Sequence, residues 1–340
     1  MKNFISNKYM VFALSIMAVL FVVISCDNTI EKKSFKNVSK TVAALDDLNS
    51  TLLSSKNVVR TLSFNPETGR TAQSFTQKDN KEDDPQISKE DFNKIALADF
   101  VGAARGWGHS KYIPFVGVTS TLIIKASVTV IISTLYSAKV YGDIIGGGTE
   151  EGTKVLAINS PMLGKLSTPS FLIASNTELT EVEVEVKKGE LSEDVELPEL
   201  YQPLMEIGAR HNLLLERIIN NNGEPLYENV NDAEYEFLTT EEFTSLYQDE
   251  YNYLLNNPIG VNLYMPSDDS TMVDEVINLF IEAFDGYPDD IEDVQELVNH
   301  YISTIEEFNE LNEEEKQFVY SGLCVAFASA DYWNSNSTVE

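Results

Sequence analysis

The sequence predicts a mainly α-helical protein: a helical bundle with a small β-hairpin insertion and a disordered N-terminal tether. Three observations carry this prediction. From about residue 200 onward, apolar side chains recur at the spacing of amphipathic helices. Residues 180–186 alternate Glu with Val at period two, which is typical of a half-exposed strand. Residues 27–87 are polar and weakly periodic, as in segments that form no packed core.

These patterns divide the 340 residues into five parts. In chain order we expect a signal peptide (1–25), a lipid-anchored flexible tether (26–87), an apolar helical segment (88–148), a Gly/Pro-rich connector with the hairpin (149–199), and an acidic helical domain (200–334).

The N-terminus has the pattern of a secretory signal. Lys2 and Lys8 precede an apolar run over residues 10–24, which is short for a membrane span. The run ends in Val23-Ile24-Ser25-Cys26, which resembles the lipobox of bacterial lipoproteins. That resemblance implies cleavage before Cys26 and a covalent lipid on its sulfur, which would attach the protein to a membrane. The expected location is therefore the cell envelope, on the periplasmic or surface face of the outer membrane.

The chain has one other cysteine, Cys324, in an apolar run near the C-terminus. Once Cys26 is acylated, no intramolecular disulfide can form. We expect Cys324 to be a buried thiol in the core.

Within the tether, a short helix is expected near residues 38–53. The apolar segment then begins at Ser88 and Asp91, which resemble a helix-capping signal. Residues 115–138 are the least polar stretch of the mature chain, and three interpretations compete for them: a buried core helix, a membrane-inserting hairpin, or a transmembrane span. The core helix is favoured, because Lys125 near mid-span is costly in lipid and buried helices are apolar all round.

The connector has helix-breaking Gly and Pro residues before the alternating strand, and Lys187-Lys188-Gly189 supplies a turn for the hairpin. Beyond it, capping boxes and apolar spacing predict five helices in the acidic domain. Their expected bounds are 203–219, 239–256, 271–284, 291–308 and 312–333, the last opened by Asn312 with Glu315.

Charge is distributed unevenly along the chain, whose formal net charge is -30. Residues 1–177 hold 19 Lys and Arg against 15 Asp and Glu, whereas residues 178–340 hold 5 against 39. Phosphate backbones would repel this acidic half, so nucleic acid is excluded as a partner. The acids either solvate helix faces or bind a basic or cationic partner.

Three short motifs resemble a group of uncharacterised exported lipoproteins of Bacteroidota. They are Ala98-Asp99-Phe100-Val101-Gly102-Ala103-Ala104, Ile207-Gly208-Ala209-Arg210-His211-Asn212 and Ala328-Ser329-Ala330-Asp331-Tyr332-Trp333. The resemblance implies class and location and supplies no activity. In such a group Asp269-Ser270-Thr271 would match an O-glycan acceptor, with Ser270 as the candidate site.

Histidines supply the candidate chemistry. Glu296 lies four residues before His300 on one predicted helix face, and His211 could join them if its helix packs alongside, which would give a metal site. Alternatively, Gly208 lets two helices approach and the His211 imidazole bonds a neighbouring group within the bundle. No metalloprotease, hydrolase or phosphate-loop motif is present, so no cofactor beyond the lipid is predicted.

Because the sequence nominates no reaction, a binding or structural module of the cell envelope is the leading expectation. The alternative is a membrane-active, pore-forming or toxin-like protein that inserts residues 92–138. The third candidate is a metal-dependent hydrolase using His211, His300 and Glu296.

Overall fold

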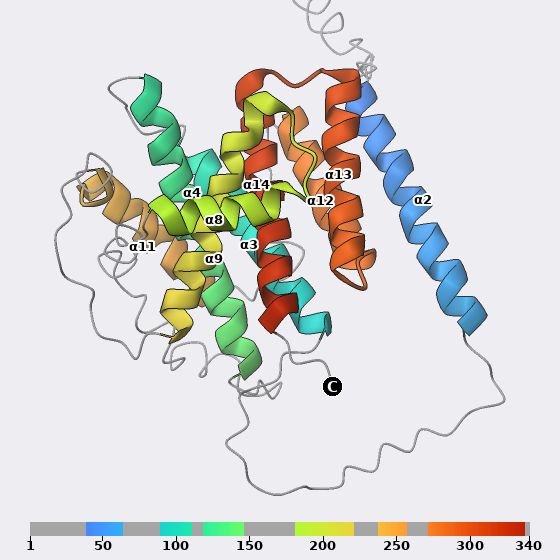
Figure 1. Cartoon of the computed structure of the whole chain (residues 1–340), viewed down its shortest axis with the longest axis horizontal. Helices are drawn as coiled ribbons and strands as arrows, with labels where there is room; N and C mark the ends of the chain where they lie inside the picture. The colour runs from blue at the N-terminus through green and yellow to red at the C-terminus, as the bar shows by residue number, and fades with distance from the viewer. Residues whose placement is uncertain are drawn as a thin grey trace, which may run out of the picture. The chain divides into compact units, whose positions relative to one another are not determined.

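The computed structural model describes residues 39–63, 89–110, 118–145, 181–220, 237–256 and 271–336. In this part of the chain there are nine α-helices and one 3₁₀ helix, and no strand (Figure 1). In chain order they are α2 (Lys40–Ser63), α3 (Lys89–Ser110), α4 (Val118–Ile145), α8 (Glu181–Ser192), η2 (Glu199–Leu204), α9 (Met205–Asn220), α11 (Glu241–Asn256), α12 (Met272–Gly286), α13 (Ile291–Phe308) and α14 (Glu313–Asn336). The mainly α prediction is therefore confirmed.

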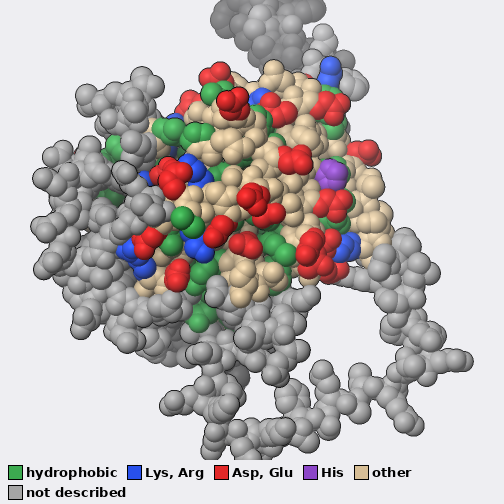
Figure 2. Space-filling model, in the orientation of Figure 1, with side chains coloured by type: hydrophobic (Ala, Val, Ile, Leu, Met, Phe, Trp, Pro, Cys, Tyr) green, Lys and Arg blue, Asp and Glu red, His purple; other side chains and the backbone are tan. Residues whose placement is uncertain are grey.

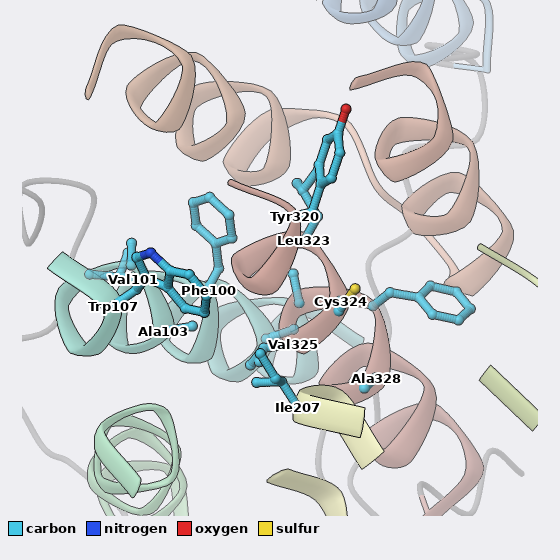
Figure 3. Packing of buried hydrophobic residues seen from close by; sticks show 14 of the residues in the cluster. Phe100, Val101, Ala103, Trp107, Ile207, Tyr320, Leu323, Cys324, Val325 and Ala328 are labelled. Atoms are coloured by element: carbon cyan, nitrogen blue, oxygen red, sulfur yellow. The ribbon is translucent and has the colours of Figure 1, made fainter. Parts of the chain in front are cut away.

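The core is built where α3 packs on α4 and α14, and where α9 packs on α4, α8 and α14. Figure 3 shows buried residues of both helices, among them Phe100 and Trp107 on α3 and Leu323 and Val325 on α14. The apolar segment and the acidic domain thus share one hydrophobic core. The acidic domain does not bury its apolar faces by itself.

Glycines allow α3 and α4 to approach closely. A Cβ on Gly102 would lie 2.7 Å from the Cα of Ser133, and one on Gly106 would lie 2.9 Å from the Cα of Thr129. Both distances are shorter than real contacts, so only glycine fits. Gly102 and Gly106 therefore lie on the surface of α3 that contacts α4.

Helix α4 contains most of the least polar stretch, and it is buried on all sides from Ser127 to Val140. Its hydroxyls are satisfied locally: Thr129 donates to the carbonyl of Lys125, and Thr134 to that of Val130. The Nζ of Lys125 donates a hydrogen bond to Oε1 of Glu314 at 2.7 Å. The structure therefore places residues 127–138 of this stretch in the core, and none of the described helices combines the length and apolarity that crossing a membrane requires.

The predicted β-hairpin is wrong, because Glu181–Ser192 forms helix α8. An isolated hairpin is marginal in water, whereas this helix buries Val184 and Leu191 and packs on α9. Helical spacing also lets Lys188 bond Glu185 at 2.6 Å. Tertiary burial and ion pairs one turn apart thus override the period-two pattern, and Val186 stays 54 % exposed.

Helix α2 lies inside the stretch expected to be a tether, yet it packs on α12 and α13. Its buried positions include Leu45 and Asn49, and the Asn49 amide donates to the carbonyl of Leu279 at 2.8 Å and accepts from the Tyr301 hydroxyl at 2.8 Å. The helix expected at 38–53 exists and is longer. The folded part begins near residue 40 instead of 88.

Caps confirm three of the helix starts predicted in the acidic domain, whereas α11 is capped by Thr240, which accepts from the amide of Phe243, one position after the expected Thr239. Asn312 and Glu315 form a reciprocal capping box at 2.8 and 3.0 Å, and Thr271 and Asp274 form another. Asp290 caps α13 by accepting from the amide of Asp293.

Candidate functional site

Four helices meet at a buried carboxylate, Asp99 of α3. Its Oδ2 accepts hydrogen bonds from the hydroxyls of Ser137 on α4, at 2.9 Å, and Ser329 on α14, at 2.5 Å. The side chain is 0 % exposed. Because a buried carboxylate without partners is costly, these hydroxyls hold Asp99 in place and tie three helices together.

His211 brings α9 to the same place. Its Nε2 lies 3.5 Å from Asp99 Oδ2, and its ring is also 0 % exposed. Its Nδ1 lies 3.2 Å from Oδ1 of Asn212, whose Nδ2 donates to the carbonyl of Ala328 at 2.7 Å. We call Asp99, Ser137, His211, Asn212 and Ser329 the four-helix junction.

Gly208 makes this junction possible. A Cβ at this position would lie 2.7 Å from the carbonyl oxygen of Cys324 and 2.8 Å from the Cβ of Ala328. Neither atom belongs to a flexible side chain, so α9 can reach α14 only with glycine here. The structural interpretation of Gly208 and His211 is the one that the structure supports.

The three sequence motifs converge on this junction. The first supplies Asp99, the second supplies Gly208, His211 and Asn212, and the third supplies Ser329 and the Ala328 carbonyl. Sequence reasoning missed Ser137, which lies outside the motifs on α4. Nothing in the sequence marks one serine among the many on that helix.

A second polar cluster surrounds Glu250 on α11. Arg105 donates to both carboxylate oxygens, from Nε to Oε2 at 2.8 Å and from Nη2 to Oε1 at 2.7 Å. The hydroxyl of Tyr136 donates to Oε2 at 2.9 Å, and His109 Nε2 lies 2.8 Å from Oε1. The Arg105 guanidinium also stacks over the ring of Tyr253, 4.4 Å from its centroid. These five residues are the Glu250 cluster.

Electrostatics keep Glu250 ionised. Burial alone would raise the pKa of its carboxyl, but the hydrogen bonds from His109 and Arg105, with the charges of both, lower it to about 2. Burial and the nearby Glu250 charge raise the pKa of Tyr136, so that this phenol stays a neutral donor. The charge-assisted hydrogen bonds of the Glu250 cluster therefore hold α11 against α3 and α4.

The sequence did contain a signal for this cluster. Phe243, Tyr247, Glu250 and Leu254 are all buried and lie on one helix face, so an acid occupies a core position of α11. Its partners could not be found from sequence, since Arg105 lies 145 residues away.

Of the three predicted metal-site residues, His300 and Glu296 are in contact, but His211 is not brought to them. His211 is inside the junction, whereas His300 on α13 is exposed, with its Nε2 3.3 Å from Oε1 of Glu296. The other oxygen of Glu296, Oε2, accepts from the Tyr287 hydroxyl at 2.8 Å. Across the described ranges, no group of three or more His, Cys, Asp or Glu is placed to hold a metal ion.

The remaining sequence candidates divide into two kinds. Cys26 and Ser270 lie outside the described residues. Cys324 is buried in α14 as expected, 3.4 Å from the Sδ of Met205, and burial raises the pKa of its thiol. A thiol that stays protonated in the core is not a nucleophile.

Comparison with protein-family models, with curated proteins and with solved structures finds no significant match. The chemistry of the site must therefore be taken from its geometry alone. The junction is closed to solvent, and every oxygen of Glu250 already accepts hydrogen bonds. Both clusters are built to hold helices together. In the Glu250 cluster, the His109 side chain is 37 % exposed and that of Arg105 is 18 % exposed, so this cluster reaches the surface.

Proposed function

We propose that the protein is a lipid-anchored protein of the cell envelope whose helical domain is a binding or structural module. The proposed anchor is a lipid on Cys26, supported by the lipobox Val23-Ile24-Ser25-Cys26 and the apolar run before it. The other cysteine, Cys324, is free and buried in α14, which disfavours a disulfide as the role of Cys26.

The module part of the proposal rests on one observation: the buried polar groups join helices instead of facing a substrate. Asp99 links α3 to α4, α9 and α14, and Glu250 links α11 to α3 and α4. Buried polar networks of this kind specify one packing of a bundle. A domain held in one packing suits recognition by its outer surface.

The outer surface favours a basic or cationic partner. Asp and Glu side chains are spread over the face seen in Figure 2, with fewer Lys and Arg among them. Exposed acids occur on α8, α11, α12, α13 and α14. Such a surface attracts cations and repels nucleic acid.

The anchor is tested by expressing the full chain in a lipoprotein-processing bacterium with a labelled fatty acid. Label should appear on the wild type and on Cys324→Ser, and should be lost from Cys26→Ser, which should also leave the membrane fraction. The matched serine substitutions change one thiol each, so they separate acylation of Cys26 from a general effect of losing a cysteine. Retention of label by Cys26→Ser would overturn the anchor.

The module is tested with the detergent-purified chain. It should bind a polylysine probe with an affinity that falls as salt rises, and should neither release dye from vesicles nor carry bound metal. Binding that is absent, or that does not depend on salt, would rule out the proposed basic partner. Dye release would favour the membrane-active alternative, in which α3 and α4 must first leave their packing on α9 and α14. Stoichiometric metal would favour the hydrolase.

A further inference from the structure

The side-chain amide of Asn212 has only one workable orientation. Its Nδ2 donates to the carbonyl of Ala328 at 2.7 Å. The reversed amide would place two acceptor oxygens against each other at that distance. Oδ1 of Asn212 therefore faces Nδ1 of His211, 3.2 Å away. Because an amide oxygen only accepts, Nδ1 must carry a hydrogen.

The other ring nitrogen of His211 also faces an acceptor. Nε2 lies 3.5 Å from Oδ2 of Asp99, the oxygen that already accepts from Ser137 and Ser329. The separation is that of an ion pair and exceeds a good hydrogen bond, and within the described residues Nε2 has no hydrogen-bond partner. A lone pair on Nε2 would point at an electron-rich oxygen in a site closed to water.

A neutral imidazole carries a hydrogen on only one nitrogen, so either neutral tautomer leaves a lone pair facing an oxygen. We infer that His211 is an imidazolium in the folded protein and that Asp99 is its buried counter-ion. In the four-helix junction, an ion pair between protonated His211 on α9 and ionised Asp99 on α3 then holds the two helices together. This assignment goes beyond the proposed function and is independent of it.

The surroundings of the pair leave no other source of charge compensation. In the part of the chain that the structure describes, Asp99 is the only ionisable side chain within ion-pair distance of His211. Helix α4 contributes the neutral Ser137, and α14 contributes the neutral Ser329 and the Ala328 carbonyl. Since the imidazole of His211 and the carboxylate of Asp99 are both fully buried, each charge depends on the other.

The experiment is nuclear magnetic resonance of the full chain in detergent micelles, labelled with ¹⁵N-histidine. The chain has three histidines, so the signals that persist in both His109→Gln and His300→Gln belong to His211. At neutral pH, both His211 nitrogens should give signals of the protonated type. A signal of the unprotonated type from either nitrogen would overturn the inference, and this measurement does not require any junction variant to fold.

A double-mutant cycle gives a second, independent readout. Asp99→Asn and His211→Gln each leave one charge buried without its partner, so each should lower the denaturant midpoint. The double variant leaves neither charge, so its loss should be clearly smaller than the combined losses of the single variants. Additive losses would mean that Asp99 is not the counter-ion of His211. In Asp99→Asn, if it folds, the imidazolium signals should be replaced by those of one neutral tautomer.

Discussion

Arg105 on α3 donates two hydrogen bonds to the carboxylate of Glu250 on α11, at 2.8 and 2.7 Å. The two side chains are mostly buried, with 18 % and 3 % exposure. Their contact joins helices that are separated by 145 positions in the sequence. The docking of α11 therefore depends on a charge pair at the centre of an apolar helix face.

Glu250→Gln should strongly destabilise the protein, because it leaves the Arg105 guanidinium buried without its counter-charge. Breaking one partner of a buried pair costs about 3–5 kcal/mol. Chemical denaturation measures the loss. Asp249→Asn, an exposed acid one position earlier, is the matched control and should stay within about 0.5 kcal/mol of the wild type. If the two changes had equal effects, the Arg105–Glu250 pair would not stabilise the docking of α11.

Acid should weaken the same contact. The pKa of Glu250 falls from 4.5 to about 2 in the folded state, so its folded form holds the proton less tightly than the unfolded form. Its stabilisation, about 3 kcal/mol, is complete above the unfolded pKa and is lost as the pH falls from there toward 2. The stability difference between wild type and Glu250→Gln should shrink over that window. A difference that does not change with pH would mean that Glu250 is not ionised in the fold.

Gly208→Ala should separate α9 from α14. The added Cβ would lie 2.7 Å from the Cys324 carbonyl oxygen, and such overpacking costs about 1–3 kcal/mol. Thermal or chemical unfolding measures it. Gly108→Ala is the control, because its Cβ would meet only Phe318 at an ordinary 3.8 Å. If both variants kept wild-type stability, the close approach of α9 to α14 would be refuted.

Gly189→Ala should act in the opposite direction. Gly189 lies within α8, and a Cβ there meets nothing within 4 Å. Replacing an exposed helical glycine with alanine stabilises by about 0.5–1 kcal/mol. The measurement is again the unfolding midpoint. A hairpin turn at Lys187-Lys188-Gly189 would give the reverse result, since its glycine would need a backbone conformation that alanine avoids.

Asn49→Ala should loosen α2. It removes the partner of the Tyr301 hydroxyl and of the Leu279 carbonyl, and each buried polar group left unpaired costs about 1–3 kcal/mol. Hydrogen exchange of the α2 amides should speed up relative to those of α14. Ser50→Ala, on the exposed side of the same helix, should leave exchange unchanged. Unchanged exchange in Asn49→Ala would show that apolar contacts alone dock α2.

The sequence by itself determined where most helices of the C-terminal half begin and end. Asn312 with Glu315, and Thr271 with Asp274, act on amides within one turn of the chain, so their effect can be predicted locally. It also favoured a buried helix for the stretch containing α4, because a helix that is apolar on all sides needs a core, but the choice against a membrane-inserting hairpin or a transmembrane span came from the structure.

Only the tertiary structure decided the rest. Glu181–Ser192 became helical because α9 offers a surface for Val184 and Leu191, which no local pattern reveals. Asp99 and His211 were visible as residues in separate motifs, yet their pairing required α3 and α9 to meet beside α4 and α14. Glu250 and Arg105 likewise became partners although they are 145 positions apart in the sequence. Packing between segments that are distant in the sequence decides which buried charges become partners. Local sequence patterns do not show which segments will pack together.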